Sequence, residues 1–194
     1  LVDTGESDDF RLRIVAPKSA RGQSKSLVIS LETLPIYPFR GYSAFTYHGQ
    51  RDQARAKNFQ FTRTAEGIRS QFPAEAEEVL LVAESGEILE GLSSNFYAIK
   101  NGNLYTASAG VLSGTTRTAV LAVAHQIGIS TVQIGWSEGR LSELDEAFIT
   151  SVSRGVLPIT WINQHRVGDG DPGYLTTKIY AAYQDWVEAH LETL

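Results

Sequence analysis

The chain has 194 residues, of which 42% are hydrophobic, enough for a packed core, and its formal net charge of −5 argues against nucleic acid as a partner. It contains no cysteine, which excludes disulfides, thiolate zinc sites and thiol nucleophiles and fits a cytoplasmic protein. No apolar run is long enough to span a membrane and no signal-peptide region opens the chain, so we expect no membrane partner.

The first 36 residues contain two predicted strands. Apolar and basic residues alternate over residues 10–16, and residues 27–31 form a second apolar run. Two prolines in residues 35–42 indicate a connecting segment. The chain has no methionine and begins Leu-Val-Asp, so we expect the complete protein to start upstream of Leu1. The predicted organisation is a part of a small N-terminal domain (residues 1–36), a linker (37–42) and a large domain (43–194).

A helix is predicted over residues 57–71. Phe61, Ala65, Ile68 and Phe72 recur at the spacing of one helical face, and Pro73 follows. Two hairpins come next, because short apolar runs flank Ser-Gly and Asn-Gly turns. These runs occupy residues 78–83, 87–89, 95–99 and 104–106.

The rest of the chain also combines predicted helices and strands. Residues 116–127 predict a helix ended by Gly128, and the final predicted helix begins with Asp171 as N-cap and Pro172 in its first turn. Predicted strands occupy residues 131–134, 147–152 and 161–167. The expected fold class is mixed α/β, with sheets that are not purely parallel.

Conventional catalytic motifs are absent from the sequence. It contains no P-loop, no nucleophile elbow and no dinucleotide-binding glycine motif after a strand. Residues 168–170 (GDG) superficially suggest phosphate binding, but a tight turn before a helix explains them. The four histidines are far apart without the spacing of metal ligands, so no metal site is predicted.

Four short segments carry the residues suited to chemistry. Each has an ordinary explanation by itself, such as a solvated lysine, an exposed acid beyond a hairpin, a helix N-cap or a polar loop. The segments are residues 56–58 around Lys57, residues 90–95 (EGLSSN), residues 112–117 (LSGTTR) and residues 150–155 (TSVSRG), which precede Pro158.

In their order and spacing these segments resemble the class IV aminotransferases, which include branched-chain and D-amino-acid aminotransferases and aminodeoxychorismate lyases. In that family a lysine precedes a helix, a Glu-Gly-x-x-x-Asn turn follows, then a Leu-x-Gly-Ile-Thr-Arg turn and a Thr/Ser-rich strand end before a proline. The resemblance runs from about residue 27 onward. It implies a D-amino-acid aminotransferase-like fold that binds pyridoxal 5'-phosphate (PLP), with a large domain rich in antiparallel sheet.

The resemblance also implies roles for individual residues. Lys57 would form the Schiff base with PLP, Glu90 would pair with the pyridine nitrogen, and Leu112 would pack on the ring. The helix start at Thr115 and Thr116 would offer N–H groups and a positive dipole end to the phosphate. The remaining residues expected at the cofactor are Ser93, Asn95, Ser151, Val152 and Ser153. No arginine near the start of the chain matches the family's phosphate-binding arginine.

The implied activity is transamination between an amino acid and a 2-oxo acid through the Lys57 aldimine, in a homodimer. Aminodeoxychorismate lyase is an alternative, because residues 153–156 (SRGV) lack the glutamate that is common in branched-chain enzymes after this strand. A second alternative is a catalytically silent PLP-fold binding protein, because Gln60 and Phe61 replace residues that bind the cofactor's ring oxygen in several relatives.

Overall fold

The computed structural model describes residues 10–15, 27–51 and 59–191, with the backbone alone at residues 59 and 60. Contacts divide the chain into two compact units, Leu1–Pro38 and Phe39–Leu194. The domain assignment stays a prediction. It divides the chain into part of a small N-terminal domain (residues 1–36), a linker (37–42) and a PLP-binding domain (43–194).

The first unit is described as one antiparallel hairpin of β1 (Phe10–Val15) and β2 (Val28–Thr33). Its polar face carries ion pairs from Arg11 and Arg13 to Glu32. The alternation of apolar and basic residues over 10–16 therefore corresponds to a strand with one apolar and one polar face.

The second unit is built on a mixed nine-stranded sheet, which confirms the predicted α/β class. Six strands of this sheet close into a ring. Going around it, each strand pairs with the next in the order β3, β4, β5, β6, β9 and β10, and β10 pairs again with β3. β3 runs parallel to both of its neighbours and the other pairs in the ring are antiparallel. The ring strands are β3 (Tyr42–His48), β4 (Glu78–Val82), β5 (Ile88–Gly91), β6 (Asn95–Lys100), β9 (Glu146–Ser151) and β10 (Gly155–Ile162).

Short strands extend the sheet beyond the ring. β7 (Asn103–Tyr105) and β8 (Thr131–Val132) follow β6, and β11 (His165–Arg166) pairs with β10. The predicted Asn-Gly turn between β6 and β7 is confirmed, since Asn101 and Gly102 both have positive φ.

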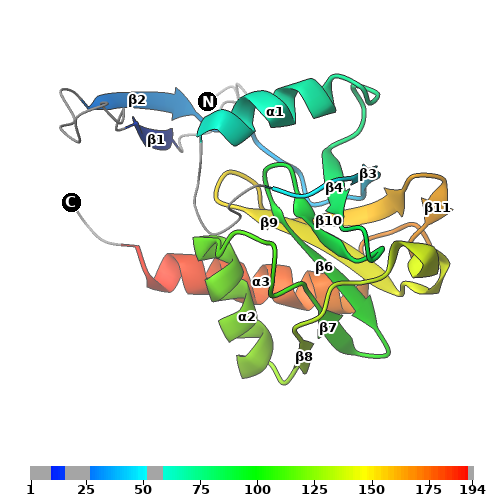
Figure 1. Ribbon diagram of the computed structural model, residues 1–194. Coiled ribbons are helices and arrows are strands. Elements are labelled where there is room, and N and C mark those ends of the chain that lie inside the picture. The colour runs from blue at the N-terminus through cyan, green and yellow to red at the C-terminus, as the bar shows by residue number, and fades with distance from the viewer. Residues whose placement is uncertain (1–9, 16–26, 52–58, 192–194) are drawn as a thin grey trace. The chain divides into compact units, whose positions relative to one another are not determined.

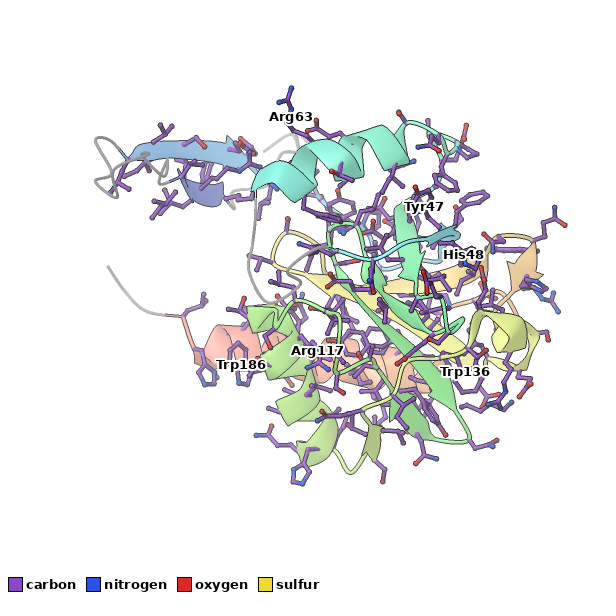
Figure 2. All side chains as sticks on the ribbon, viewed as in Figure 1. Tyr47, His48, Arg63, Arg117, Trp136 and Trp186 are labelled. Atoms are coloured by element: carbon purple, nitrogen blue, oxygen red, sulfur yellow. The ribbon has the colours of Figure 1, made fainter. Side chains whose placement is uncertain are left out.

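The helices cover the outer surface of the ring on two sides (Figure 1). α1 (Phe59–Arg69) packs Phe61 and Ile68 against Val79 and Leu81 of β4, while Arg63 points away from the strands (Figure 2). On the other side, α2 and α3 share one core with β6 and β9, whose Tyr97 and Phe148 rings stack at 4.5 Å. The remaining bounds are α2 (Thr115–Gln126), the 3-10 helix η1 (Glu138–Glu143) and α3 (Tyr174–Ala189). Within the described residues no helix is both long and apolar enough to cross a bilayer.

Alternation along β4 separates the inner and outer faces of the ring. Val79 and Leu81 face α1, so Glu78, Leu80 and Val82 face the interior. All five of these residues are buried. Glu78 is thus a charged residue on the inner face of a buried strand.

Three features of the fold were not predicted from the sequence. β3 lies in the segment after the prolines, η1 precedes β9, and β10 begins at Gly155, ahead of the strand predicted from residue 161. β3 is a central strand with partly buried residues on both faces, so its sequence has no clear polar–apolar alternation.

Two predictions about the C-terminal part were wrong. Residues 161–167 are not one strand: β10 ends at Ile162, Asn163 turns the chain with a φ of 54°, and β11 follows. The N-cap of α3 is Gly173 rather than Asp171. The Glu146 carboxylate accepts hydrogen bonds from the N–H groups of Leu175 and Thr176, at 2.9 and 2.6 Å, so a residue distant in sequence caps this helix.

Candidate functional site

Glu90 is a buried acid at the end of β5. The register of the β4–β5 pairing shifts within β5, and such a β-bulge redirects the side chains beside it. Glu90 lies directly opposite Asn95 in the β5–β6 hairpin, and directly opposed residues project to the same face of a sheet. The Glu90 side chain is 1% exposed.

The Glu90 carboxylate is held by the loop that precedes α2. Its Oε2 accepts a hydrogen bond from the Leu112 N–H at 2.8 Å and a longer one, at 3.5 Å, from the side-chain amide of Asn95. The same amide donates to the Leu112 carbonyl oxygen at 2.9 Å. Glu90, Asn95 and Leu112 therefore form one hydrogen-bonded group.

Arg51 is the cation beside this group. Its Nε lies 2.9 Å from Glu90 Oε1, but the two atoms are not aligned as a hydrogen bond, so the contact is electrostatic. Arg51 also donates to the Leu92 carbonyl oxygen and stacks over the Phe61 ring at 4.0 Å. Burial raises the pKa of Glu90 above its ordinary value, although the Leu112 N–H and the Arg51 charge act in the opposite direction.

The start of α2 lies against the same group. Gly114 is its N-cap, and no described side chain caps the first N–H groups, in contrast to the Glu146 cap of α3. A Cβ atom on Gly114 would lie 2.6 Å from Asn95 Oδ1, so glycine permits the close approach of the helix start to Asn95. Free N–H groups and the helix dipole make this end suitable for an anion.

A second buried cluster surrounds Glu78 on the inner face of β4. Glu78 Oε2 accepts hydrogen bonds from the hydroxyls of Ser93 and Ser94, at 3.0 and 2.8 Å, and pairs with Arg154 at 2.7 Å. Arg154 also donates from Nε to the Ser151 hydroxyl at 3.2 Å. The turn after Glu90 is thereby tied to the turn after β9.

The structure brings several of the predicted site residues together. Glu90, Asn95, Leu112 and the Thr115–Thr116 helix start form the first group, and Ser93 and Ser151 meet through Arg154. The two groups lie on neighbouring strands, because Asn95 pairs with Thr150. Val152 is 70% exposed, and it adjoins Ser153 in the turn after Ser151. Lys57 lies outside the described residues.

Sequence reasoning did not assign roles to Arg51, Glu78 or Arg154. One signal was present, because Glu78 begins a strand whose other residues are all apolar, and an acid buried in such a strand needs a cation. The sequence does not indicate which arginine meets which acid, since Glu78 and Arg154 lie 76 positions apart.

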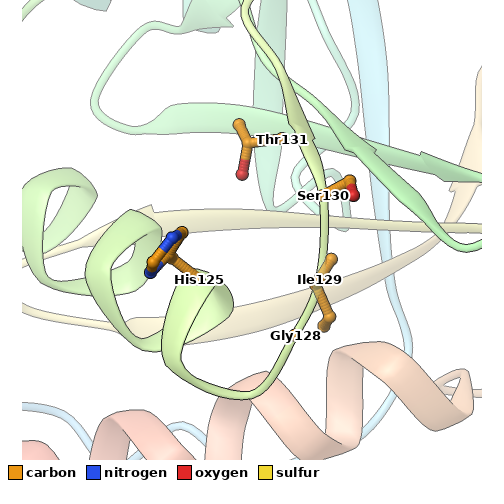
Figure 3. A pocket seen from close by; sticks show the side chains of 5 residues that line it. All are labelled: His125, Gly128, Ile129, Ser130 and Thr131. Atoms are coloured by element: carbon orange, nitrogen blue, oxygen red, sulfur yellow. The ribbon is translucent and has the colours of Figure 1, made fainter.

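A surface hollow of about 350 Å³ lies at the other end of α2 (Figure 3). Its lining residues are His125, Gly128, Ile129, Ser130 and Thr131, none of which is a predicted site residue. Because His125 lies ten residues after Thr115 in α2, the hollow is separated from the Thr115 end by about 15 Å of helix, so it does not belong to the candidate site.

Sequence comparisons relate the chain to one family. The sequence model of the family described as Amino-transferase class IV matches residues 1–162. A branched-chain-amino-acid aminotransferase of Pseudomonas aeruginosa is 31% identical over 157 residues, or 77% of this chain and 51% of that protein. A D-alanine aminotransferase of Bacillus licheniformis is 35% identical over 114 residues, or 58% of this chain and 40% of that protein. The chain thus spans 40 to 51% of the length of these two curated relatives.

Solved structures show the same fold, as predicted. The branched-chain amino acid aminotransferase from Escherichia coli superposes with a TM-score of 0.76 at 22% identity, over 94% of this chain and 65% of that chain. The T.th. branched-chain amino acid aminotransferase, complexed with N-(5'-phosphopyridoxyl)-L-glutamate, has a TM-score of 0.71 at 24% identity over 78% of this chain and 53% of that chain.

The contact between Gly114 and Asn95 predicts that Gly114→Ala destabilises the protein by about 1–3 kcal/mol, because the added methyl group overpacks the Asn95 side chain. The backbone of Gly114, at φ −68° and ψ 144°, suits any residue, so the cost comes from this contact. Gly67→Ala is the control. Gly67 lies within α1 with open space around it, and alanine there should stabilise by about 1 kcal/mol. Equal denaturant midpoints for the two variants would contradict the prediction.

The raised pKa of Glu90 predicts a pH dependence of stability. The unfolded carboxyl titrates near its ordinary value of 4.5 and the folded one at a higher pH, so the folded state binds more protons between the two values. The free energy of unfolding, measured relative to Glu90→Gln, should therefore be highest below pH 4.5 and fall as pH rises through the folded pKa. Urea unfolding of both proteins across this range tests the sign. A difference that rises with pH would show that Leu112 and Arg51 outweigh burial.

Proposed function

Because the chain belongs to the class IV aminotransferase family, we propose that it supports PLP-dependent transamination between an amino acid and a 2-oxo acid, with Lys57 as the lysine that binds the cofactor covalently. The observation that best supports this is the buried Glu90 carboxylate beside the uncapped start of α2. Such an arrangement offers one acceptor for a ring N–H and one anion site at a fixed separation.

The pyridine nitrogen of PLP fits the environment of Glu90. Its Oε1 is buried and lies 2.9 Å from Arg51 Nε without an aligned donor, so a protonated ring nitrogen would give this acceptor an aligned N–H. Burial raises the pKa of Glu90, but the Leu112 N–H and the Arg51 charge oppose this rise, and a protonated ring nitrogen would add a further positive charge in favour of the ionised carboxylate that this pairing requires.

The phosphate fits the start of α2. The first N–H groups of the helix, at Thr115 and Thr116, would bind the phosphate oxygens, and the helix dipole favours their charge. Because Gly114 lacks a side chain, the helix start can lie close to Asn95, which places these N–H groups near Glu90. The predicted N–H and hydroxyl groups of residues 151–153 would complete the cradle.

The chemistry of the reaction divides between cofactor and protein. Bound PLP supplies an electron sink for charge that develops at the substrate Cα. Lys57 would hold the cofactor through its Nζ and, once released by the substrate amine, move the Cα proton on that nitrogen. Leu112 would support the ring face, and Glu90 would keep the ring nitrogen protonated.

Substrate and assembly are part of the same proposal. The relatives' names describe branched-chain-amino-acid and D-alanine aminotransferases, and we propose a small amino acid and a 2-oxo acid as the substrates of this protein. We also propose the homodimer and the cytoplasmic location that the resemblance and the composition suggested.

Cofactor binding can be tested directly at Lys57. The protein mixed with PLP should acquire a visible absorbance that borohydride removes, and mass spectrometry should find the reduced cofactor on the peptide that contains Lys57. Lys57→Ala should lose this label, while Lys178→Ala, an exposed lysine on α3, should keep it. A wild-type protein that takes up no PLP, or a label on another lysine, would refute the assignment.

The reaction type can be tested with an amino-donor panel. With 2-oxoglutarate as acceptor, we expect equal amounts of glutamate and of the 2-oxo acid from one donor class among branched-chain L-amino acids and D-alanine. Pyruvate and 4-aminobenzoate from aminodeoxychorismate, without an acceptor, would indicate a lyase instead. A protein that binds PLP but performs neither reaction would be a silent member of the family.

A further inference from the structure

Arg154 links three segments of the candidate site. Its side chain is 8% exposed and pairs with Glu77 at 3.0 Å and Glu78 at 2.7 Å. It also donates from Nη2 to the Ser93 hydroxyl at 2.8 Å and from Nε to the Ser151 hydroxyl at 3.2 Å. One planar guanidinium therefore contacts the start of β4, the turn after Glu90 and the turn after β9.

The buried Glu78 carboxylate holds Arg154 in place. It is 2% exposed on the inner face of the ring, and its Oε1 accepts from the Val79 N–H at 3.0 Å. Burial alone would lower the pKa of Arg154, but the Glu78 and Glu77 carboxylates outweigh it and raise that pKa. A carboxylate buried in this way requires its cation, so Arg154 stays on Glu78 and carries the 151–155 turn with it.

The hydroxyls of Ser93 and Ser151 have different hydrogen-bonding roles. Ser93 accepts from Arg154 and donates its single hydrogen to Glu78, so that hydrogen serves the cluster. Ser151 accepts from Arg154 Nε, which leaves its own hydrogen free to donate to another acceptor. Arg154 thus leaves Ser151 as a donor at the end of β9, directly before the exposed Val152.

We propose that Arg154 is a positioning residue for the PLP site, an inference that rests on the proposed function. It fixes the 151–155 turn against the turn after Glu90, so that the Ser151 hydroxyl and the N–H groups of Val152 and Ser153 stand at a set distance from Glu90 and meet the cofactor phosphate. Asn95 of β6 pairs with Thr150 of β9, so the two turns adjoin neighbouring strands. Arg154 acts through the turn and does not touch the cofactor itself.

Two variants separate this positioning role from a contribution to folding. Arg154→Met removes the guanidinium and leaves Glu78 buried without its cation, so the cofactor-free protein should melt at a lower temperature. Adding Glu78→Gln removes the unpaired charge and should restore most of that melting temperature. Neither protein retains the link to Ser151, so both should bind PLP about tenfold more weakly or worse, as misplaced binding groups do.

The measurements are the dissociation constant for PLP from absorbance titration, that for inorganic phosphate from competition with PLP, and the melting temperature without cofactor. Arg154→Lys should keep the melting temperature near wild type but bind PLP with intermediate affinity, because one ammonium cannot hold Glu78 and both serines together. Arg140→Met is the matched control, since it breaks an exposed ion pair with Glu143 and should leave both PLP affinity and stability near wild type.

The outcomes distinguish the positioning role from the proposed function. If the wild-type protein binds PLP and the Glu78→Gln, Arg154→Met protein binds it equally well, the positioning role is refuted and the function stands. If PLP affinity recovers in parallel with the melting temperature, Arg154 has only a folding role. If the wild-type protein binds no PLP, both are refuted. Should Arg154→Met fail to fold, the double variant and Arg154→Lys decide the question.

Discussion

A carboxylate can be buried only where donors or a cation surround it, and this constraint organises the site around Glu90. A β-bulge in β5 accompanies the placement of Glu90 beside Asn95. The Leu112 N–H and Arg51 then meet the carboxylate. Because Leu112 leads directly into α2, satisfying the acid also places an uncapped helix start next to it. The contact between Glu90 and Leu112 therefore both satisfies the buried acid and places the uncapped start of α2, which suits an anion, beside it.

Glu78 imposes the same constraint on the opposite face of the sheet. β4 and β5 are neighbours in the ring, yet Glu78 faces the interior whereas Glu90 faces the side of α2. Arg154 neutralises Glu78 and holds the turn after β9. In the proposed PLP site the two acids would therefore fix separate parts, Glu90 the ring-nitrogen acceptor and Glu78 the phosphate cradle, each through the loop that satisfies its charge.

The closed ring explains why segments far apart in the sequence act together. β5, β6 and β9 are consecutive neighbours, so residues 90–95 and 150–155 adjoin although some 60 positions separate them. Family membership and a shared fold with branched-chain aminotransferases agree with this arrangement. The ring leaves the outer face for helices α1, α2 and α3 and keeps the candidate site at the ends of its strands.

The sequence by itself determined the features that depend on local physics. Alternation in one strand, and short apolar runs beside a Ser-Gly and an Asn-Gly turn, identified most strands. An apolar stripe identified α1, and the order of four short segments identified the family. Tertiary structure alone decided which distant charges meet. Arg154 and Glu78 are joined by ring closure, and Glu146, not Asp171, caps α3, because buried charges and helix ends take whichever partner the fold places beside them. β3 escaped prediction for the same reason, since strands on both sides define its environment.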